Sequence, residues 1–315
     1  MDDLRLRDTP ELRGPAMILG FTGWMNGGNV SIGTVDHFVR QTKARRLAEI
    51  DPLEFYVLNF PVATLPTVGQ SVEQTGLSGM EIAAIFRPHT EIEDGVVKRF
   101  VPETNVFRFS TAPELILFYG EEPHIRWRSY SDCVLEVARR FNVREIYFVG
   151  SVAGPFPHTR EPRVRCSTAR EEHKERFAGY DVSFTDYSGP ASLVTYLTIR
   201  ADEMGIPLRS IVVDVPMYPT VQMNVYPRSI LRVVRLLSEL LRLRTDTSSL
   251  EQAVESVREQ IDKVVAGDPE LRQLVDKMET VYDTEVGGDD EDLLRRLMEG
   301  MGPDGQPDER PPDEE

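Results

Sequence analysis

The sequence of 315 residues is poor in the side chains that build metal centres. It contains two cysteines, Cys133 and Cys166, and five histidines. The cysteines form no C-x-x-C pair, and no two histidines have the i, i+4 or H-E-x-x-H spacing of a metal site. We therefore expect no metal and no other cofactor. So few cysteines also suit a reducing compartment.

The sequence also lacks an apolar run long enough to cross a membrane. Its first residues, 1–14, are charged and contain no apolar core of a signal peptide. The formal net charge of −16 argues against nucleic acid and anionic membranes as partners, because both repel an acidic protein. These absences predict a cytoplasmic protein with neither kind of partner.

Phosphate-binding and hydrolase motifs are incomplete. Residues 15–33 predict a strand at 16–22, a glycine-rich turn and a helix start, which together can offer amide groups to an anion. However, G-x-G-x-x-G is absent, and Asn29 and Val30 stand where the Walker motif requires Lys and Ser or Thr. Residues 150–154, GSVAG, are not the G-x-S-x-G of hydrolases. The glycines are expected mainly to permit a tight turn.

Short apolar runs instead alternate with amphipathic stretches along most of the chain. The runs predict strands, and the 3.6-residue periodicity predicts helices. We expect strands at 16–22, 53–60, 115–119, 145–150, 163–168, 182–186 and 211–215, a hairpin of 96–101 with 105–109, and helices ending near 46 and covering 130–141, 169–177, 190–204 and 226–243. Cys133 lies on the apolar stripe of its helix, so it is expected to be a buried hydrophobe. The alternation predicts a three-layer α/β/α fold with a mostly parallel sheet.

The remaining regions differ in composition. Residues 62–87 read as a long polar loop with a short helix at 80–86. Residues 1–244 are expected to form the α/β domain and residues 245–286 a helical extension, opened by a capping box of Ser248 and Glu251. Residues 287–315 hold eleven acidic residues against three arginines, a net charge of −8, and are expected to be disordered apart from a short helix at 291–298.

Four polar turns fall where strands of the sheet should end. Ligands bind at the carboxyl ends of the strands in parallel α/β sheets, so residues 23–29, 151–160, 188–192 and 217–224 define a candidate cleft. Its candidate ligand-binding residues are Asn26, Gly27, Gly28, Ser151, His158, Arg160, Ser188 and Ser192. For the serines, helix capping or an ordinary turn role is the simpler interpretation. No catalytic residue is assigned.

Three blocks resemble the proteasome assembly chaperone 2 family. They are GFTGWMNGGNVSIGTVDHFV at 20–39, PHIRWRSYSDCVLEVARRFNVREIYFVGSVAGPFPHTR at 123–160 and YSGPASLVTYLTIRADEMGIPLRSIVVDVPMY at 187–218. LVDKME at 274–279 resembles the C-terminal extension of the actinobacterial branch. The resemblance implies a phosphorylase-like α/β/α domain, self-assembly that is often trimeric in bacterial members, and no enzymatic activity.

The sequence departs from this family in two places. Some relatives carry a C-terminal hydrophobic-Tyr-X motif that docks on proteasome α-subunits, whereas this sequence ends Pro-Pro-Asp-Glu-Glu, so docking by that route is not expected. Met217 also stands where relatives often have His. Two hypotheses follow: a non-enzymatic oligomeric chaperone-like protein with a protein partner, or a nucleoside- or phosphate-ligand-binding enzyme related to the purine nucleoside phosphorylases.

Overall fold

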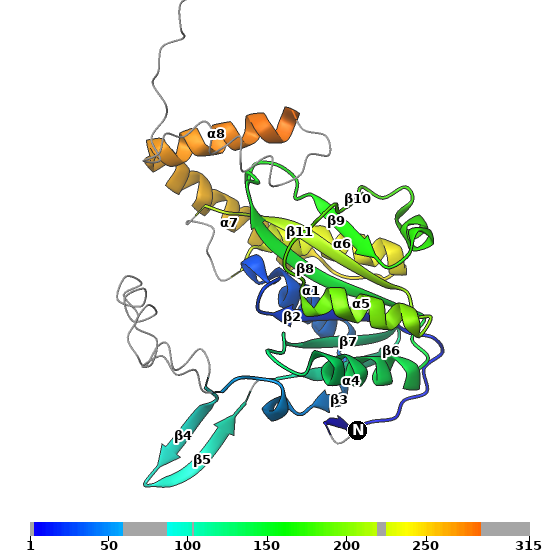
Figure 1. Ribbon diagram of the computed structural model, residues 1–315. Coiled ribbons are helices and arrows are strands. Elements are labelled where there is room, and N and C mark those ends of the chain that lie inside the picture. The colour runs from blue at the N-terminus through cyan, green and yellow to red at the C-terminus, as the bar shows by residue number, and fades with distance from the viewer. Residues whose placement is uncertain (1–2, 59–86, 103, 219–224, 285–315) are drawn as a thin grey trace, which may run out of the picture.

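A nine-stranded sheet forms the centre of the protein (Figure 1). A computed structural model describes residues 3–58, 87–102, 104–218 and 225–284. The strands lie in the order β1-β3-β6-β7-β2-β8-β11-β9-β10. Their bounds are β1 (Leu4–Leu6), β2 (Ala16–Thr22), β3 (Arg45–Ile50), β6 (Val106–Thr111), β7 (Glu114–Glu121), β8 (Glu145–Gly154), β9 (Val164–Thr168), β10 (Ser183–Phe184) and β11 (Leu208–Pro216).

The four central strands, β7, β2, β8 and β11, run parallel to one another. Strands towards the two edges add antiparallel pairs, such as β6 with β7 and β9 with β11. Residues 16–21 of β2 and residues 145–151 of β8 are buried throughout, because helices cover both faces of the sheet. The predicted three-layer fold built on parallel central strands is thus confirmed.

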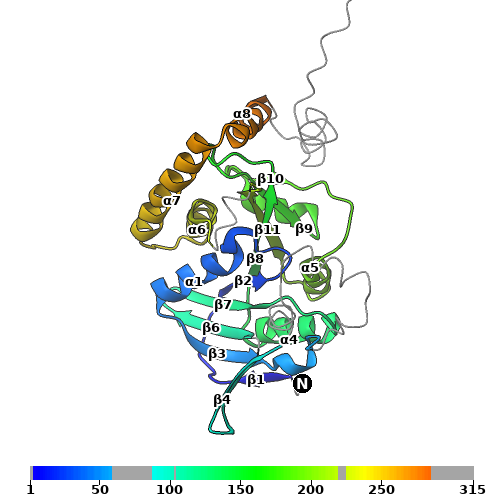
Figure 2. The same cartoon turned by 90° about the vertical axis from the view of Figure 1, so that its left-hand side faces the viewer.

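Helices cover the sheet on both sides (Figure 2). On one side lie α4 (Trp127–Arg140) and α5 (Leu193–Glu203), and on the other lie α1 (Val30–Thr42) and α6 (Pro227–Leu241). Each side has its own apolar cluster, one containing Cys133 and Phe148, the other Ile230 and Tyr147. As predicted, Cys133 is fully buried.

Two more helices, α7 (Ser248–Gly267) and α8 (Pro269–Thr284), form the predicted C-terminal extension. Helix α6 packs against both α1 and α7, so its apolar excess, including Leu231 and Leu236, is buried within the chain. Ile261 and Met278 belong to the same cluster as α6. The domain boundary at 244/245 therefore stays a prediction. At the start of α7 the Thr247 hydroxyl, not that of Ser248, donates to the Glu251 carboxylate at 2.8 Å.

Several predicted elements are wrong. Residues 45–46 do not close the first helix but begin β3, because Lys43 adopts a left-handed conformation (φ 49°) that ends α1. Residues 53–58 form no strand, since Pro52–Glu54 is a 3-10 helix capped by the Asp51 side chain. The helix expected at 169–177 is present, as the 3-10 helix Glu171–Phe177. Residues 59–60, the loop and helix expected at 62–86 and the tail from 287 lie outside the described residues.

The predicted hairpin is also wrong in its pairing. Strand β5 (Val96–Val101) pairs with β4 (His89–Glu93), whereas residues 106–109 belong to β6 in the main sheet. The β4–β5 hairpin, hereafter the arm (residues 89–101), forms a separate two-stranded sheet that projects from the body at the lower left of Figure 1.

Candidate functional site

The turn between β2 and α1 meets the end of β8. The Ser151 N–H donates to the Met25 carbonyl at 3.0 Å, and the Ser151 hydroxyl donates to the Gly27 carbonyl at 2.7 Å. The structure therefore brings Asn26, Gly27, Gly28 and Ser151 together. The Ser151 side chain is fully buried and already hydrogen-bonded, so it is not free to act on a ligand.

The Asn26 side chain organises the start of α1. Its Nδ2 donates to Asn29 Oδ1 at 3.0 Å, and its Oδ1 accepts from the Ile32 N–H at 3.3 Å. An amide group at the helix start that an anion would need is thus occupied by the chain itself. The contacts of Asn26 are those of a residue that caps a helix, and they leave fewer free amide groups for a phosphate.

Gly28 lets the turn pack closely against the start of α6. Its φ is +56°, and a Cβ at this position would lie 2.7 Å from the Tyr226 Cβ. The Tyr226 N–H donates to the Gly28 carbonyl at 2.7 Å. A side chain would be excluded here by both backbone strain and contact. The glycine thus serves packing between two helices.

His158 follows β8 and is buried, with 3% of its surface exposed. Its Nδ1 is hydrogen-bonded to the Tyr218 hydroxyl, which also accepts from the His158 N–H at 2.7 Å. Its Nε2 lies 3.0 Å from Asp262 Oδ1 on α7. Burial raises the pKa of Tyr218 well above its ordinary value, so the hydroxyl stays protonated. The histidine joins the loop after β8 to the C-terminal extension.

Arg160 makes a second connection to the extension. Its guanidinium donates to both Asp283 carboxylate oxygens, at 2.8 Å and 2.7 Å, and lies 3.5 Å from Glu279. Arg163 in the same loop stacks over the Tyr282 ring, 4.0 Å from its centroid. The structure thus places His158 and Arg160 against α7 and α8, away from the β2–α1 turn contacts.

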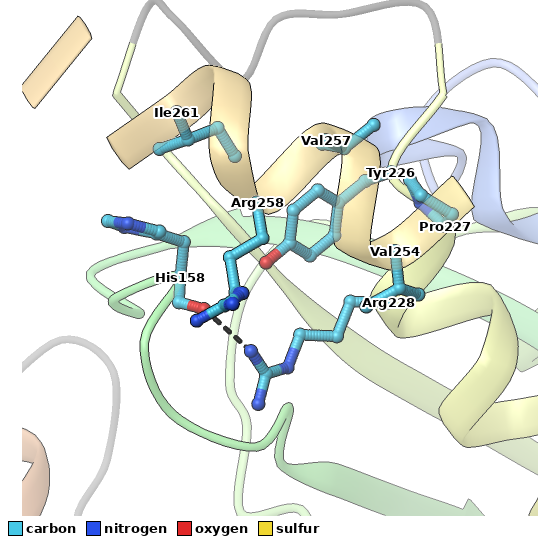
Figure 3. A pocket seen from close by; sticks show the side chains of 8 residues that line it. All are labelled: His158, Tyr226, Pro227, Arg228, Val254, Val257, Arg258 and Ile261. Atoms are coloured by element: carbon cyan, nitrogen blue, oxygen red, sulfur yellow. Dashed lines mark hydrogen bonds between the residues drawn. The ribbon is translucent and has the colours of Figure 1, made fainter. Parts of the chain in front are cut away.

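A small pocket lies between α7 and the start of α6 (Figure 3). Its volume is about 10 Å³, which is room for about one water molecule. The Arg228 side chain crosses it and donates to the His158 carbonyl at 2.9 Å, as the dashed line shows. It is lined by His158, Tyr226, Pro227, Arg228, Val254, Val257, Arg258 and Ile261. This pocket cannot take a nucleoside, since small-molecule sites span several hundred Å³.

Ser188 and Ser192 precede α5 on the other side of the sheet. The helix begins at Leu193, so the start expected at 188–190 is wrong, and the Ser192 side chain makes no capping hydrogen bond. Glu122, at the end of β7, caps the helix instead: its Oε1 accepts from the Leu193 N–H at 2.8 Å. A carboxylate at a helix N-terminus is stabilised by the helix dipole. Sequence spacing gave no signal for Glu122, because it is distant from α5 in the chain.

Two exposed apolar side chains follow the strands β2 and β7 near this contact. Trp24 is 73% exposed and Ile125 46%. A Cβ at Gly23 would lie 3.4 Å from the Glu122 Cβ. Trp24 follows the end of β2, and Ile125 follows the end of β7, which pairs with β2 in parallel, so both lie at the carboxyl edge of the sheet. We call Trp24 and Ile125 the edge patch. Sequence reasoning missed it, although a tryptophan directly after a central strand was a usable signal.

Reactive groups are otherwise protected or dispersed. Burial raises the pKa of Cys133 to about 11 and that of Cys166 to about 12, so both remain thiols. Within the described ranges, no three His, Cys, Asp or Glu side chains gather to hold a metal ion. Nor does any helix among those residues combine the length and apolarity needed to cross a bilayer.

Fold and edge together define a three-layer α/β/α protein. The polar groups at its strand ends are hydrogen-bonded within the chain, and the tryptophan beside them is exposed. The chain belongs to the PAC2 family, whose model matches residues 20–265. A comparison of the sequence with curated proteins found no match.

Solved structures share the fold. A protein of unknown function from Corynebacterium glutamicum is 19% identical with a TM-score of 0.71, over 90% of this chain and 97% of that chain. The Mycobacterium tuberculosis proteasome-assembly chaperone homologue is 22% identical with a TM-score of 0.65, over 82% and 99%. PbaB of Pyrococcus furiosus, an archaeal proteasome activator, is 18% identical with a TM-score of 0.57, over 83% and 97%.

Proposed function

We propose that the protein is a non-enzymatic, self-assembling protein-interaction protein of the assembly-chaperone type, acting in the cytoplasm. One observation carries the proposal. At the carboxyl edge the polar groups of Asn26 and Ser151 are bonded within the chain, while the Trp24 side chain is exposed to solvent. Catalysis needs positioned groups that can reach a substrate, whereas protein interfaces are enriched in exposed aromatic anchors.

The family suggests the kind of partner. Among the similar structures are a proteasome-assembly chaperone homologue and an archaeal proteasome activator. We infer that this chain binds a proteasome subunit or an assembly intermediate through its carboxyl edge. We also infer that it assembles with itself, as a trimer.

The test is a reconstitution with purified proteasome α- and β-subunits from the same organism. Native gels would follow the formation of complete particles with and without the chain. We expect the chain to bind free α-subunits and to change the rate at which particles form. Absence of both effects would overturn the proposed partner.

A matched pair of variants links the effect to the edge. Trp24→Glu places a charge in the edge patch, and Ile199→Glu places one on α5, where Ile199 is 53% exposed outside that patch. Trp24→Glu is expected to weaken subunit binding at least about tenfold, and Ile199→Glu to leave it unchanged. If both substitutions weaken subunit binding equally, the carboxyl edge is not the binding surface.

A nucleoside- or phosphate-binding enzyme is the competing hypothesis. A ligand at about 100 times its dissociation constant would stabilise the chain by about 2.7 kcal/mol. Thermal unfolding with nucleosides, nucleotides and phosphate measures this directly. We expect no stabilisation, because the Ser151 hydroxyl and the Asn26 amide already bond within the chain. A clear rise in melting temperature would favour the enzyme.

A further inference from the structure

The arm has two chemically different faces. The strand register shifts between Glu91 and Ile92, so Lys98 has no partner on β4. Ile92 therefore pairs with Val97 and Thr90 with Phe100, which places these side chains on one face. The other face carries the pairs Glu91–Arg99, Glu93–Val96 and His89–Val101, with an ion pair of 3.3 Å between Arg99 and Glu91. One face of the arm is therefore apolar and the other mainly charged.

The apolar face is open to solvent. Ile92 is 59% exposed, Val97 63% and Phe100 55%. A two-stranded hairpin is marginally stable alone in water and needs a surface against which to bury its apolar face. An exposed apolar face on a projecting element is typical of an interaction site.

The same chain carries a complementary surface. The arm leads into β6, which begins opposite Tyr119 near the carboxyl end of β7, so arm and edge patch arise at the same edge of the sheet. Neither covers the other within one chain, since both are exposed. Each therefore has apolar surface available to a second copy.

Charge at the tip of the arm favours a copy of the chain as the occupant. The arm, residues 89–101, contains three acidic and two basic residues and so carries a net charge of −1. Glu93 and Asp94 at its tip form no ion pair with a described residue, and the same holds for Arg128, which is exposed three residues after Ile125. Docking of the tip near Arg128 would bring these opposite charges together.

We propose that the arm of one copy docks through Ile92, Val97 and Phe100 on the edge patch of a second copy. Because donor and acceptor surfaces differ, the contact is head-to-tail, and repetition around an axis closes a ring. The inference rests on the self-assembly proposed above and assigns the surfaces that make it. A docked arm and a proteasome subunit would then compete for the edge patch.

Two neighbouring valines provide the test. Val96 and Val97 have similar exposure, 54% and 63%, but point to opposite faces of the arm. Light scattering coupled to size-exclusion chromatography would measure the mass of the full chain carrying Val96→Glu or Val97→Glu. Val97→Glu is expected to weaken self-association at least about tenfold, while Val96→Glu leaves it unchanged. Equal masses for both variants would overturn the arm contact.

Mixing distinguishes head-to-tail docking from arm-to-arm pairing. The Val97→Glu variant has an arm that cannot dock and an intact edge patch. The Trp24→Glu variant has an intact arm and an edge patch that cannot accept one. An equimolar mixture regenerates one intact contact and is expected to give a two-chain species that neither variant forms alone. A mixture that stays monomeric overturns the proposal.

The outcomes also separate this inference from the proposed function. If the wild-type protein assembles and the Val97→Glu variant assembles equally well, the arm contact is overturned, but self-assembly is not. If the wild-type protein is monomeric but binds proteasome subunits, a second copy does not occupy the edge patch, and the proposed proteasome partner is unaffected. A wild-type protein that neither assembles nor binds subunits refutes both.

Discussion

The Arg160 guanidinium donates two hydrogen bonds to the Asp283 carboxylate, of 2.8 Å and 2.7 Å. The pair ties the loop after the central strand β8 to the last described helix, α8. The bond from Arg160 lowers the pKa of Asp283 below its ordinary value. The carboxylate therefore stays charged at neutral pH and holds the helix.

Asp283→Asn is expected to loosen α8 alone. The amide keeps one acceptor oxygen but loses the charge, so exchange of the α8 amides should quicken roughly two- to five-fold. Hydrogen–deuterium exchange measures this, with the amides of β2 and β8 as an internal reference. Asp276→Asn is the matched control, since Asp276 lies on α8 and its side chain forms no ion pair with a described residue. Faster exchange in the control as well would contradict the role of the pair.

The same contact predicts an acid dependence. A lowered pKa in the folded state means that Asp283 stabilises the fold above its unfolded pKa of about 3.9. That contribution is lost as the pH falls through the lower, folded value. Amide exchange in α8, corrected for the intrinsic effect of pH, should therefore quicken in acid in the wild-type protein. In Asp283→Asn it should not quicken further. Identical acid profiles for the two proteins would count against this account.

His158 is expected to matter for stability. His158→Ala leaves the buried Tyr218 hydroxyl without its imidazole partner and removes the contact with Asp262. Unpaired buried polar groups cost about 1–3 kcal/mol each, so the free energy of unfolding should fall by about that amount. Denaturant titration measures it. Asp262→Asn, at a half-exposed carboxylate, should cost less than about 0.5 kcal/mol; the reverse order would be inconsistent with the structure.

The cap of α5 gives a fourth prediction. Glu122→Ala removes the acceptor for the Leu193 N–H and should destabilise the protein by about 0.5–2 kcal/mol. Ser192→Ala should change stability by less than about 0.5 kcal/mol, because the Ser192 side chain makes no capping bond. Chemical unfolding of both variants is the measurement. A larger loss for Ser192→Ala would restore the serine cap expected from the sequence.

The two cysteines should be unreactive in the folded protein. With pKa values of about 11 and about 12, Cys133 and Cys166 hold little thiolate at pH 8 and are buried. A thiol reagent should label both only after unfolding. Because the folded pKa values are raised, their contribution to stability is complete below the unfolded pKa of about 8.5 and is lost as the pH rises towards 11 and 12. Prompt labelling of either native thiol would be unexpected.

The sequence predicted the buried elements best. Strands β2, β7, β8 and β11 are apolar runs between two helical layers, and α4 and α6 have apolar stripes, so local pattern and tertiary burial agree. Strand β3 was missed because Arg45 and Arg46 are exposed near the sheet edge and read as helix-ending cations. The strand that pairs with β5 was misassigned, because sequence periodicity identifies a strand, whereas its pairing depends on the whole fold.

The site could be predicted only in part. The position of Ser151 after a central strand was enough to place it near the turn of Asn26. The contacts that hold His158 and Arg160 come from α7 and α8, over a hundred residues later in the chain. Such partners depend on how the extension folds back, which no local spacing encodes.

Trp24 provides the most direct test of the central claim that the carboxyl edge is a protein-contact surface. The chain has two tryptophans, Trp24 and Trp127, so Trp127→Phe leaves Trp24 as the only indole reporter. Acrylamide quenching of this variant would be measured over a dilution series, alone and with proteasome α-subunits. The account predicts that Trp24, 73% exposed in the single chain, becomes shielded and its emission shifts to the blue as complexes form. Complexes in which Trp24 stays as accessible as in the isolated chain would contradict it.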